Sequence, residues 1–332
     1  MSAESRLNIA HPPPPALRPR EARRPPHFLG IGAPRCGTSW VFKMLRLHPD
    51  VWMPWKEIHY FDSADPGTES GYDMQSRSFR LKLGWRYIAW RLAVRTVPGA
   101  RALARRFLPL QATEAPGYRW SARFLLGEAS LDWYRELFRE GTERDLCCGE
   151  ITPAYFMLSR EAIARLAADL PGVRAFLLLR NPLDWAWSGI CKDARDAGLD
   201  PAAMSDADLI ARCPAPERRG RADFAGNLGR WLEQFPRERL LIGFHDEIEA
   251  DPVEFLGRLC AHIGVGAMPD RVRELAAQRV NSSARDLPMP GAVERHVAAR
   301  FAEQAEIMAR IAGGPALQWL DQIRNVTRVK HA

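Results

Sequence analysis

The chain has 332 residues, 46% of them hydrophobic and 26% charged. This is the composition of an ordinary globular protein with enough apolar residues for a sizeable core. The formal net charge of +7 favours anionic ligands. No nucleic-acid-binding motif accompanies that charge, so we predict no nucleic-acid partner.

The cysteine and histidine patterns argue against a disulfide-stabilised protein and against a metalloprotein. The six cysteines are scattered without a C-x-x-C pair, and the eight histidines show neither H-x-x-x-H nor H-E-x-x-H spacing. We therefore expect reduced thiols and no metal site.

The start of the sequence lacks an apolar signal region, and no apolar run reaches transmembrane length. Together these features predict a cytoplasmic protein without a transmembrane segment.

The predicted elements alternate along most of the chain. Residues 1–26 contain HPPPP and a run of arginines and prolines, which is typical of a disordered basic tail. From there on, short apolar runs alternate with helical patterns, which predicts a single α/β domain over 27–332 with a central parallel sheet. We expect strands at Phe28–Ile31, Val51–Met53, Cys147–Ile151, Val173–Leu179 and Leu240–Phe244. We expect helices at 38–47, 159–169, 183–197, 223–234, 252–263 and 291–312, with Ser159 and Asp223 as two of the N-caps.

Two stretches interrupt this alternation. Between 63 and 146 we expect a mainly helical insertion, in which a basic segment, 80–108, interleaves arginines with tryptophan, tyrosine and leucine. The favoured interpretation is that its apolar face packs on the core. The alternative is a surface for peripheral contact with a membrane or with an acyl-bearing acceptor. Prolines and mixed charges predict a mobile loop over 199–222.

The first strand leads into a turn suited to an anion. The segment FLGIGAPRCGTSW, Phe28 to Trp40, reads as a buried strand, a Gly-Pro turn and a helix. Backbone N–H groups and the helix dipole converge at such a turn. A nucleotide triphosphatase would place lysine directly after the second glycine, but Thr38 stands there and the nearest cation is Arg35. A generic Gly-Pro turn remains the alternative for this loop alone.

A second strand-to-helix junction also carries a cation. In FLLLRNPLDWAWSGICK, Phe176 to Lys192, Arg180 ends a buried strand and Ser188 follows two helical turns later. The guanidinium can pair with a phosphate in bidentate fashion while the hydroxyl donates a further hydrogen bond. Taken alone, the two residues would only finish a strand and lie in a helix.

Together the two junctions resemble one family. PRCGTSW, Pro34 to Trp40, resembles the P-K-S-G-T-[ST]-W loop of sulfotransferases that use 3′-phosphoadenosine 5′-phosphosulfate (PAPS), with arginine in place of lysine. The resemblance implies a three-layer α/β/α fold like that of P-loop nucleotide triphosphatases. It also implies that Arg180 and Ser188 hold the 3′-phosphate, and that Trp40 lies near the adenine. The residues implied to hold the phosphosulfate are Arg35, Cys36, Gly37, Thr38 and Ser39.

A third string carries the implied base. MPWKEIHYFD, Met53 to Asp62, resembles the K-E-x-H-[FY]-F-D segment of the glycan and bacterial sulfotransferase branch, in which the glutamate is the catalytic base. Carried over, Glu57 would take the proton of an acceptor hydroxyl while Arg35 stabilises the departing phosphate of 3′,5′-adenosine bisphosphate. Because the cytosolic small-molecule branch uses histidine, His59 is the competing base.

A fourth string, GEITPAYF, Gly149 to Phe156, resembles the E-x-[ST]-P-x-Y segment of the same family. Glu150 and Thr152 are candidates to orient the acceptor or the loop, and Tyr155 to line the pocket, while a structural role is the alternative for all three. The sequence thus predicts transfer of a sulfuryl group from PAPS to a hydroxyl of a glycan, a glycosylated compound or a small metabolite. The alternatives are a nucleotide-dependent phosphotransferase on the same fold and a non-catalytic nucleotide-binding scaffold.

Overall fold

The computed structural model describes residues 25–68, 72–82, 117–216, 220–277 and 287–328. Within these residues the chain forms one sheet of five parallel strands in the order β2-β3-β1-β4-β5. The strands are β1 Phe28–Gly32, β2 Val51–Trp52, β3 Cys147–Ile151, β4 Arg174–Leu179 and β5 Leu240–Phe244. All five predicted strands are confirmed, each to within one residue at either end. The predicted tail up to residue 24 lies outside the described residues.

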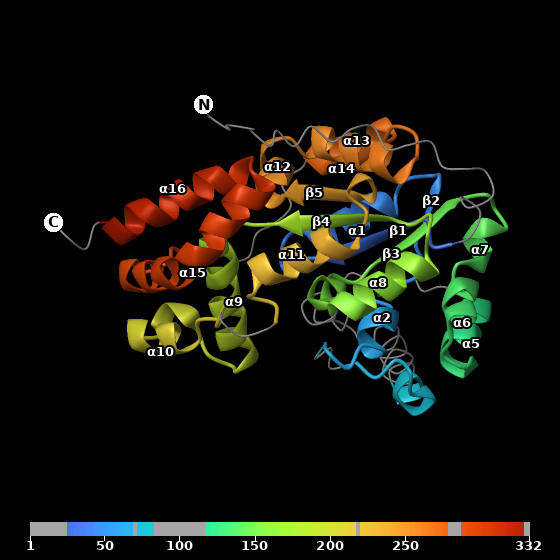
Figure 1. The fold of residues 1–332 in the computed structure, drawn as a ribbon, viewed down its shortest axis with the longest axis horizontal. Helices are drawn as coiled ribbons and strands as arrows, with labels where there is room; N and C mark the ends of the chain where they lie inside the picture. The colour runs from blue at the N-terminus through green and yellow to red at the C-terminus, as the bar shows by residue number, and fades with distance from the viewer. Residues whose placement is uncertain (1–24, 69–71, 83–116, 217–219, 278–286, 329–332) are drawn as a thin grey trace, which may run out of the picture.

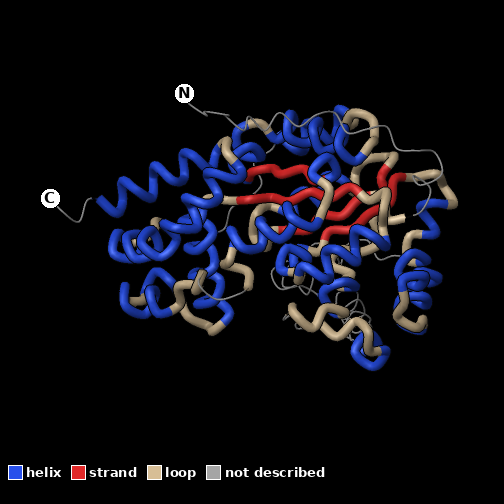
Figure 2. The backbone as a smooth tube through the Cα atoms, viewed as in Figure 1, coloured by secondary structure: helices blue, strands red, loops and turns tan. Residues whose placement is uncertain are grey.

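Helices surround this sheet, which Figure 2 shows in red at the centre of the molecule. Those in the first half of the chain are α1 Thr38–Leu45, α2 Tyr60–Ser63, α5 Tyr118–Leu126, α6 Leu131–Glu136, α7 Arg139–Thr142 and α8 Arg160–Asp169. Those in the second half are α9 Pro182–Asp196, α10 Asp206–Ala211, α11 Phe224–Gln234, α12 His245–Ala250, α13 Pro252–Ile263, α14 Asp270–Ala277, α15 Gly291–Ala312 and α16 Pro315–Arg328. Short 3₁₀ turns occur at η2 Pro153–Met157, η3 Pro201–Ala203 and η4 Arg237–Arg239.

The sheet is buried on both faces. Every residue of β1, β4 and β5 is buried, as expected when helices cover both sides of a parallel sheet. Helix α13 packs against β4 and β5, and α8 packs against α11. The paired helices α15 and α16 lie together at one end of the molecule (Figure 1). This α/β architecture is the predicted one.

The two predicted N-caps are also confirmed. The Ser159 side chain accepts a hydrogen bond from the Ala162 N–H at the start of α8, and Asp223 accepts one from the Gly226 N–H at the start of α11. Such caps satisfy backbone donors that the helix itself leaves without a partner.

The stretch 199–222 is not a loop throughout. It contains η3 and α10, because Ser205 caps α10 and Leu209 is buried against the rest of the protein. The mobility of the stretch stays a prediction. In the expected insertion, the described residues 117–146 form α5, α6 and α7, while 83–116, which hold most of the basic segment 80–108, lie outside the described residues.

A buried arginine joins the beginning of this insertion to its later helices. Arg80 is fully buried, and its Nε donates to the Phe124 carbonyl at 2.9 Å. Its two other nitrogens donate to the carbonyls of Met74, Gln75 and Gly127. The guanidinium also lies 4.9 Å from the centre of the Trp133 ring. A desolvated cation needs such partners, so we infer that Arg80 holds residues 74–80 against residues 124–127.

Candidate active site

The candidate residues gather at one edge of the sheet. The loop after β1 holds residues 33–37, and the loop after β2 holds Lys56 and Glu57. Thr152 directly follows β3, and Arg180 directly follows β4. Parallel strands bring their carboxyl ends to the same edge, which is where open α/β sheets bind ligands. Four motifs that are far apart in the sequence therefore belong to one region.

The turn after β1 is a backbone cradle at the start of α1. Gly37, the N-cap of α1, has a φ of 96°, in the left-handed region that favours glycine. The helix has no side-chain cap, so backbone N–H groups of its first turn stay available for an anion. Two contacts fix the cradle: the Ala33 N–H donates to the Leu178 carbonyl, and Trp185 Nε1 donates to the Pro34 carbonyl, both at 2.8 Å.

Arg35 lies against α9. Its Nη1 is only 2.8 Å from the position that a Cβ would take at Gly189, so a glycine at that position leaves room for the guanidinium. Burial and the charge of Arg221 both lower the pKa of Arg35, which still remains a cation. Ser188, half-buried, precedes Gly189 on the same helix. The structure thus brings the first and second motifs together.

The surroundings of Arg180 are those expected of a residue that binds an anion. The residue is only 9% exposed, and its Nε has no hydrogen-bond partner among the described residues. It lies close enough to Cys36 that its charge opposes the effect of burial on the thiol. A buried guanidinium with an N–H donor left over is a good match for a phosphate group. The position of Arg180 therefore suits an anionic group such as a phosphate.

Two residues of the loop have structural side chains. Cys36 is fully buried, and burial raises the pKa of its thiol to about 12 despite the nearby Arg180 and Arg35. Trp40 is also buried, with its ring 6.5 Å from that of Phe255 on α13. Its predicted contact with the adenine stays a prediction. Of the two hydroxyls, Thr38 is buried and Ser39 exposed.

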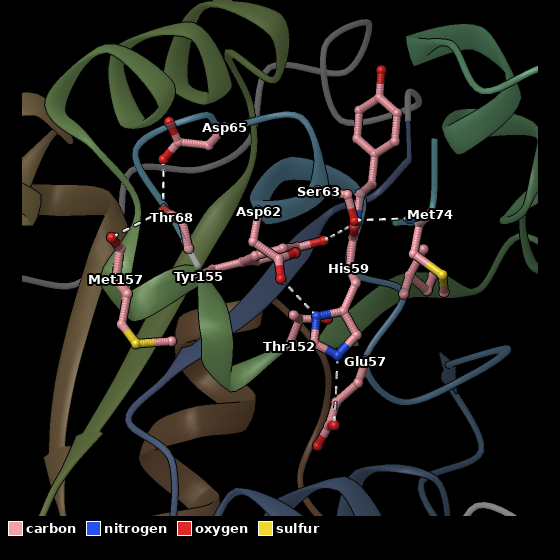
Figure 3. Close-up of polar contacts among 12 residues, drawn as sticks. Glu57, His59, Asp62, Ser63, Asp65, Thr68, Met74, Thr152, Tyr155 and Met157 are labelled. Atoms are coloured by element: carbon pink, nitrogen blue, oxygen red, sulfur yellow. Dashed lines mark hydrogen bonds and ion pairs between the residues drawn. The ribbon is translucent and has the colours of Figure 1, made fainter. Parts of the chain in front are cut away.

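The loop after β2 concentrates charge. Lys56 Nζ lies 2.6 Å from Glu57 Oε1 and 3.0 Å from Ser39 Oγ. On the other side of Glu57, His59 Nε2 lies 3.7 Å from Oε2, within ion-pair range. His59 Nδ1 contacts Asp62 Oδ2 at 2.7 Å, and Figure 3 shows the imidazole between the two carboxylates. The structure thus brings Glu57 and His59, the two candidate bases, into one hydrogen-bonded and ionic chain.

These neighbours shift both titratable groups. Burial alone would raise the pKa of Glu57, but its interactions with His59 and Lys56 prevail and lower it to about 2. Burial would likewise lower the pKa of His59, but Asp62 and Glu57 raise it to about 9. At neutral pH, Glu57 is therefore a carboxylate and His59 an imidazolium. An imidazolium cannot accept a proton, so this state favours Glu57 as the base.

Glu150 supports the same loop from β3. It is fully buried, and its carboxylate accepts hydrogen bonds from the Ile58 N–H and from the hydroxyls of Thr152, Tyr134 and Tyr155. The Ile58 N–H lies between the two candidate bases in the chain. Of the roles considered for Glu150, its contact with the Ile58 N–H favours orientation of the loop after β2.

The sequence interpretation missed several contributors to the site. Asp62 is fully buried, and its spacing of three residues from His59 was a usable signal. The Tyr72 ring, 3.9 Å from that of His59 and nearly parallel to it, and Gly189 beside Arg35 gave no such signal, because both contacts depend on tertiary packing. Trp120 on α5 is buried, and its indole N–H donates to the Leu137 carbonyl.

Two features are absent from the described residues, namely a cluster of metal ligands and a membrane-spanning helix. No three or more His, Cys, Asp or Glu side chains there are grouped to hold a metal ion. Within the same residues, no helix has both the length and the apolar character needed to cross a membrane.

Comparison with known proteins identifies the family. Residues 26–270 match the model of the Sulfotransferase family. The chain is 23% identical over 247 residues to human heparan sulfate glucosamine 3-O-sulfotransferase 6, covering 73% of this chain and 53% of that protein. It is also 23% identical over 246 residues to human heparan sulfate glucosamine 3-O-sulfotransferase 3B1, covering 72% of this chain and 46% of that protein. The chain thus spans about half the length of these curated relatives.

A solved structure agrees in fold. The sulfotransferase from Alicyclobacillus acidocaldarius superposes with a TM-score of 0.53 at 21% identity, covering 89% of this chain and 98% of that one. With the parallel sheet and the family match, the class is a P-loop-like sulfotransferase fold. The chain belongs to the sulfotransferase family.

Proposed function

We propose that the chain transfers a sulfuryl group from PAPS to a hydroxyl group of an acceptor. The observation that carries this proposal is that two strand-to-helix junctions at one sheet edge each hold an arginine. Arg180 at one junction is buried with an Nε that has no hydrogen-bond partner among the described residues, and Arg35 at the other lies beside Gly189. The names of the curated relatives support a sugar hydroxyl as the acceptor.

The residues present fit the two ends of this donor. Arg180 and Ser188 would hold the 3′-phosphate, and the N-terminus of α1, with Arg35 and Ser39, would hold the phosphosulfate. When bound, the donor supplies the sulfuryl group, whose bond to the phosphate oxygen breaks as its bond to the acceptor oxygen forms. Most of the catalytic effect assigned to the protein is positioning and electrostatics.

The charged chain after β2 would handle the proton. Glu57 is 28% exposed at its side chain, so an acceptor hydroxyl can reach it. It takes the proton of that hydroxyl as the oxygen attacks sulfur. His59, fixed by Asp62, holds the carboxylate in place rather than acting as the base. Arg35 stabilises the charge left on the departing phosphate.

Binding of two nucleotides tests the donor assignment. We expect Arg180→Ala to weaken adenosine 3′,5′-bisphosphate binding by about 10-fold or more, since a charge-assisted hydrogen bond is lost. Binding of adenosine 5′-monophosphate, which lacks the 3′-phosphate, should barely change. Isothermal titration calorimetry measures both affinities. Equal losses for the two nucleotides would refute the role of Arg180, and tighter binding of magnesium-ATP than of the bisphosphate would favour a phosphotransferase.

A further inference from the structure

Lys56 links two parts of the proposed site that the sequence leaves separate. Its side chain is only 7% exposed, yet its ammonium group reaches Ser39 in the first turn of α1 as well as the neighbouring Glu57. An ammonium has three N–H donors, and these two contacts account for two of them. Lys56 is thus a buried cation between the phosphate cradle and the candidate base.

The position of Arg35 makes this cation significant. The guanidinium of Arg35 lies beside Gly189 on α9, whereas Lys56 lies beside Ser39 on α1. The loop after β1 lacks the lysine typical of phosphosulfate-binding loops. A lysine is nevertheless present at the start of α1, supplied by the loop after β2.

We propose that Lys56 is a second cation of the donor site, which binds the phosphosulfate group beside Ser39 and in doing so releases Glu57 to act as the base. This inference rests on the proposed function. Ser39 and Glu57 both contact the same ammonium, so a small rotation of the lysine side chain towards Ser39 exchanges Glu57 for an anion bound there. After transfer, Lys56 stabilises the electron pair that the broken sulfur–oxygen bond leaves on the phosphate.

The electrostatics of Glu57 are consistent with this exchange. With Lys56 and His59 both in contact, the pKa of Glu57 is held at about 2, too low for an effective general base near neutral pH. Loss of the Lys56 contact removes one of the two interactions that lower this pKa. The carboxylate is therefore a weak base before the donor binds and a stronger one afterwards, which couples acceptor deprotonation to the presence of donor.

Two nucleotides that differ only at the 5′ position test the first half of the proposal. Adenosine 3′,5′-bisphosphate carries a 5′-phosphate, and adenosine 3′-monophosphate does not. We expect Lys56→Met to weaken the bisphosphate by about 10- to 100-fold in calorimetry and to leave the monophosphate unchanged. The matched control is Lys43→Met, which removes an exposed lysine from the same helix that carries Ser39 and should bind both nucleotides like the wild type.

The outcomes separate the two proposals. Unchanged bisphosphate binding by Lys56→Met would overturn the role of Lys56. If in the same experiment Arg180→Ala lost both the bisphosphate and adenosine 3′-monophosphate, the donor site would still be supported, because both of these nucleotides carry the 3′-phosphate. Retained monophosphate binding shows that Lys56→Met is folded. Wild-type protein that binds neither nucleotide would overturn both proposals.

Carboxyl-carbon NMR of Glu57 tests the second half. On addition of the bisphosphate, the pKa of Glu57 should rise in the wild type, because the ammonium moves to the phosphate. In Lys56→Met the pKa should start higher and rise less, since the only remaining effect is the charge of the nucleotide. Equal rises in the two proteins would show that Lys56 does not leave Glu57.

Discussion

Glu57 and His59 adopt a backbone conformation that side chains usually avoid. Their φ angles are 63° and 56°, in the left-handed region. Such strain persists only where the surroundings enforce it, and it concentrates at functional sites. Here the Glu57 N–H donates to the Ile151 carbonyl at 2.9 Å and the Ile58 N–H to Glu150 at 3.0 Å. With these left-handed conformations, the Glu57 and His59 side chains lie in one series of charged contacts that runs from Lys56 to Asp62.

Removal of the carboxylate charge tests the role of Glu57 as the base. We expect Glu57→Gln to lower turnover by about 10²- to 10⁴-fold, the usual contribution of a general base. Binding of adenosine 3′,5′-bisphosphate should stay intact, because the glutamine keeps the shape of the side chain. Steady-state kinetics with PAPS and calorimetry measure the two effects. If turnover stays near normal, His59 or another group must be the base.

At the level of elements, β3 determines where the loop after β2 lies. Glu150 occupies the strand, and its carboxylate binds the loop after β2, the 3₁₀ turn η2 and α6 at once. Burial raises the pKa of Glu150, although the hydroxyl and amide donors around it favour the charged form. A buried carboxylate of this kind is stable only with all its partners.

Glu150→Gln should therefore disturb the loop while leaving the donor site whole. An amide cannot accept hydrogen bonds on both sides, so at least one donor, such as the Ile58 N–H, loses its partner at about 1–3 kcal/mol. We expect a lower melting temperature and a lower kcat with unchanged bisphosphate affinity.

Tyr134→Phe is the matched control for this variant. It removes one hydroxyl from the same carboxylate on the side away from Ile58, so it should cost stability but spare kcat. Equal losses of kcat in the two variants would argue that Glu150 matters for stability alone.

Regular elements were more predictable than contacts between loops. Apolar runs located all five strands, and the apolar periodicity located the six longer helices that the sequence indicated, because both patterns are local. The sequence did not indicate α2, α10, α12, α14 or α16. The first three of these are only four, six and six residues long. The Lys56–Ser39 contact joins residues 17 apart whose loops meet only after β2 pairs with β3.

At the scale of the whole molecule, the charged chain makes stability depend on pH. The pKa of His59 in the folded protein is about 9, above its ordinary value of 6.5. The folded state thus binds this proton more tightly than the unfolded state does. The resulting stabilisation is present in full below pH 6.5 and is lost as the pH rises through about 9.

Unfolding by urea measures this contribution. The free energy of unfolding of wild type should exceed that of His59→Gln by more below pH 6.5 than above pH 9. The part of the difference that does not change with pH reports the lost hydrogen bond between the imidazole and Asp62 and the lost packing of the ring. A difference that is the same at both pH values would contradict the proposed protonation of His59 between its two carboxylates.

The arrangement of the whole molecule also explains why Arg35 lies against α9, which the motifs alone do not indicate. The motifs indicate the residues of the proposed donor site, but Arg35 meets α9 only because Trp185 holds the Pro34 carbonyl and residue 189 has no side chain. Neither contact is visible in the motif itself.

The buried Arg80 has a consequence for how such a protein can diversify. Arg80 and Phe124 are 44 residues apart in the sequence, yet one guanidinium holds the carbonyls of both flanks together. The carbonyl partners of Arg80 all lie outside positions 81–123. The sequence between these positions can therefore change in length or composition without removing a partner of the guanidinium.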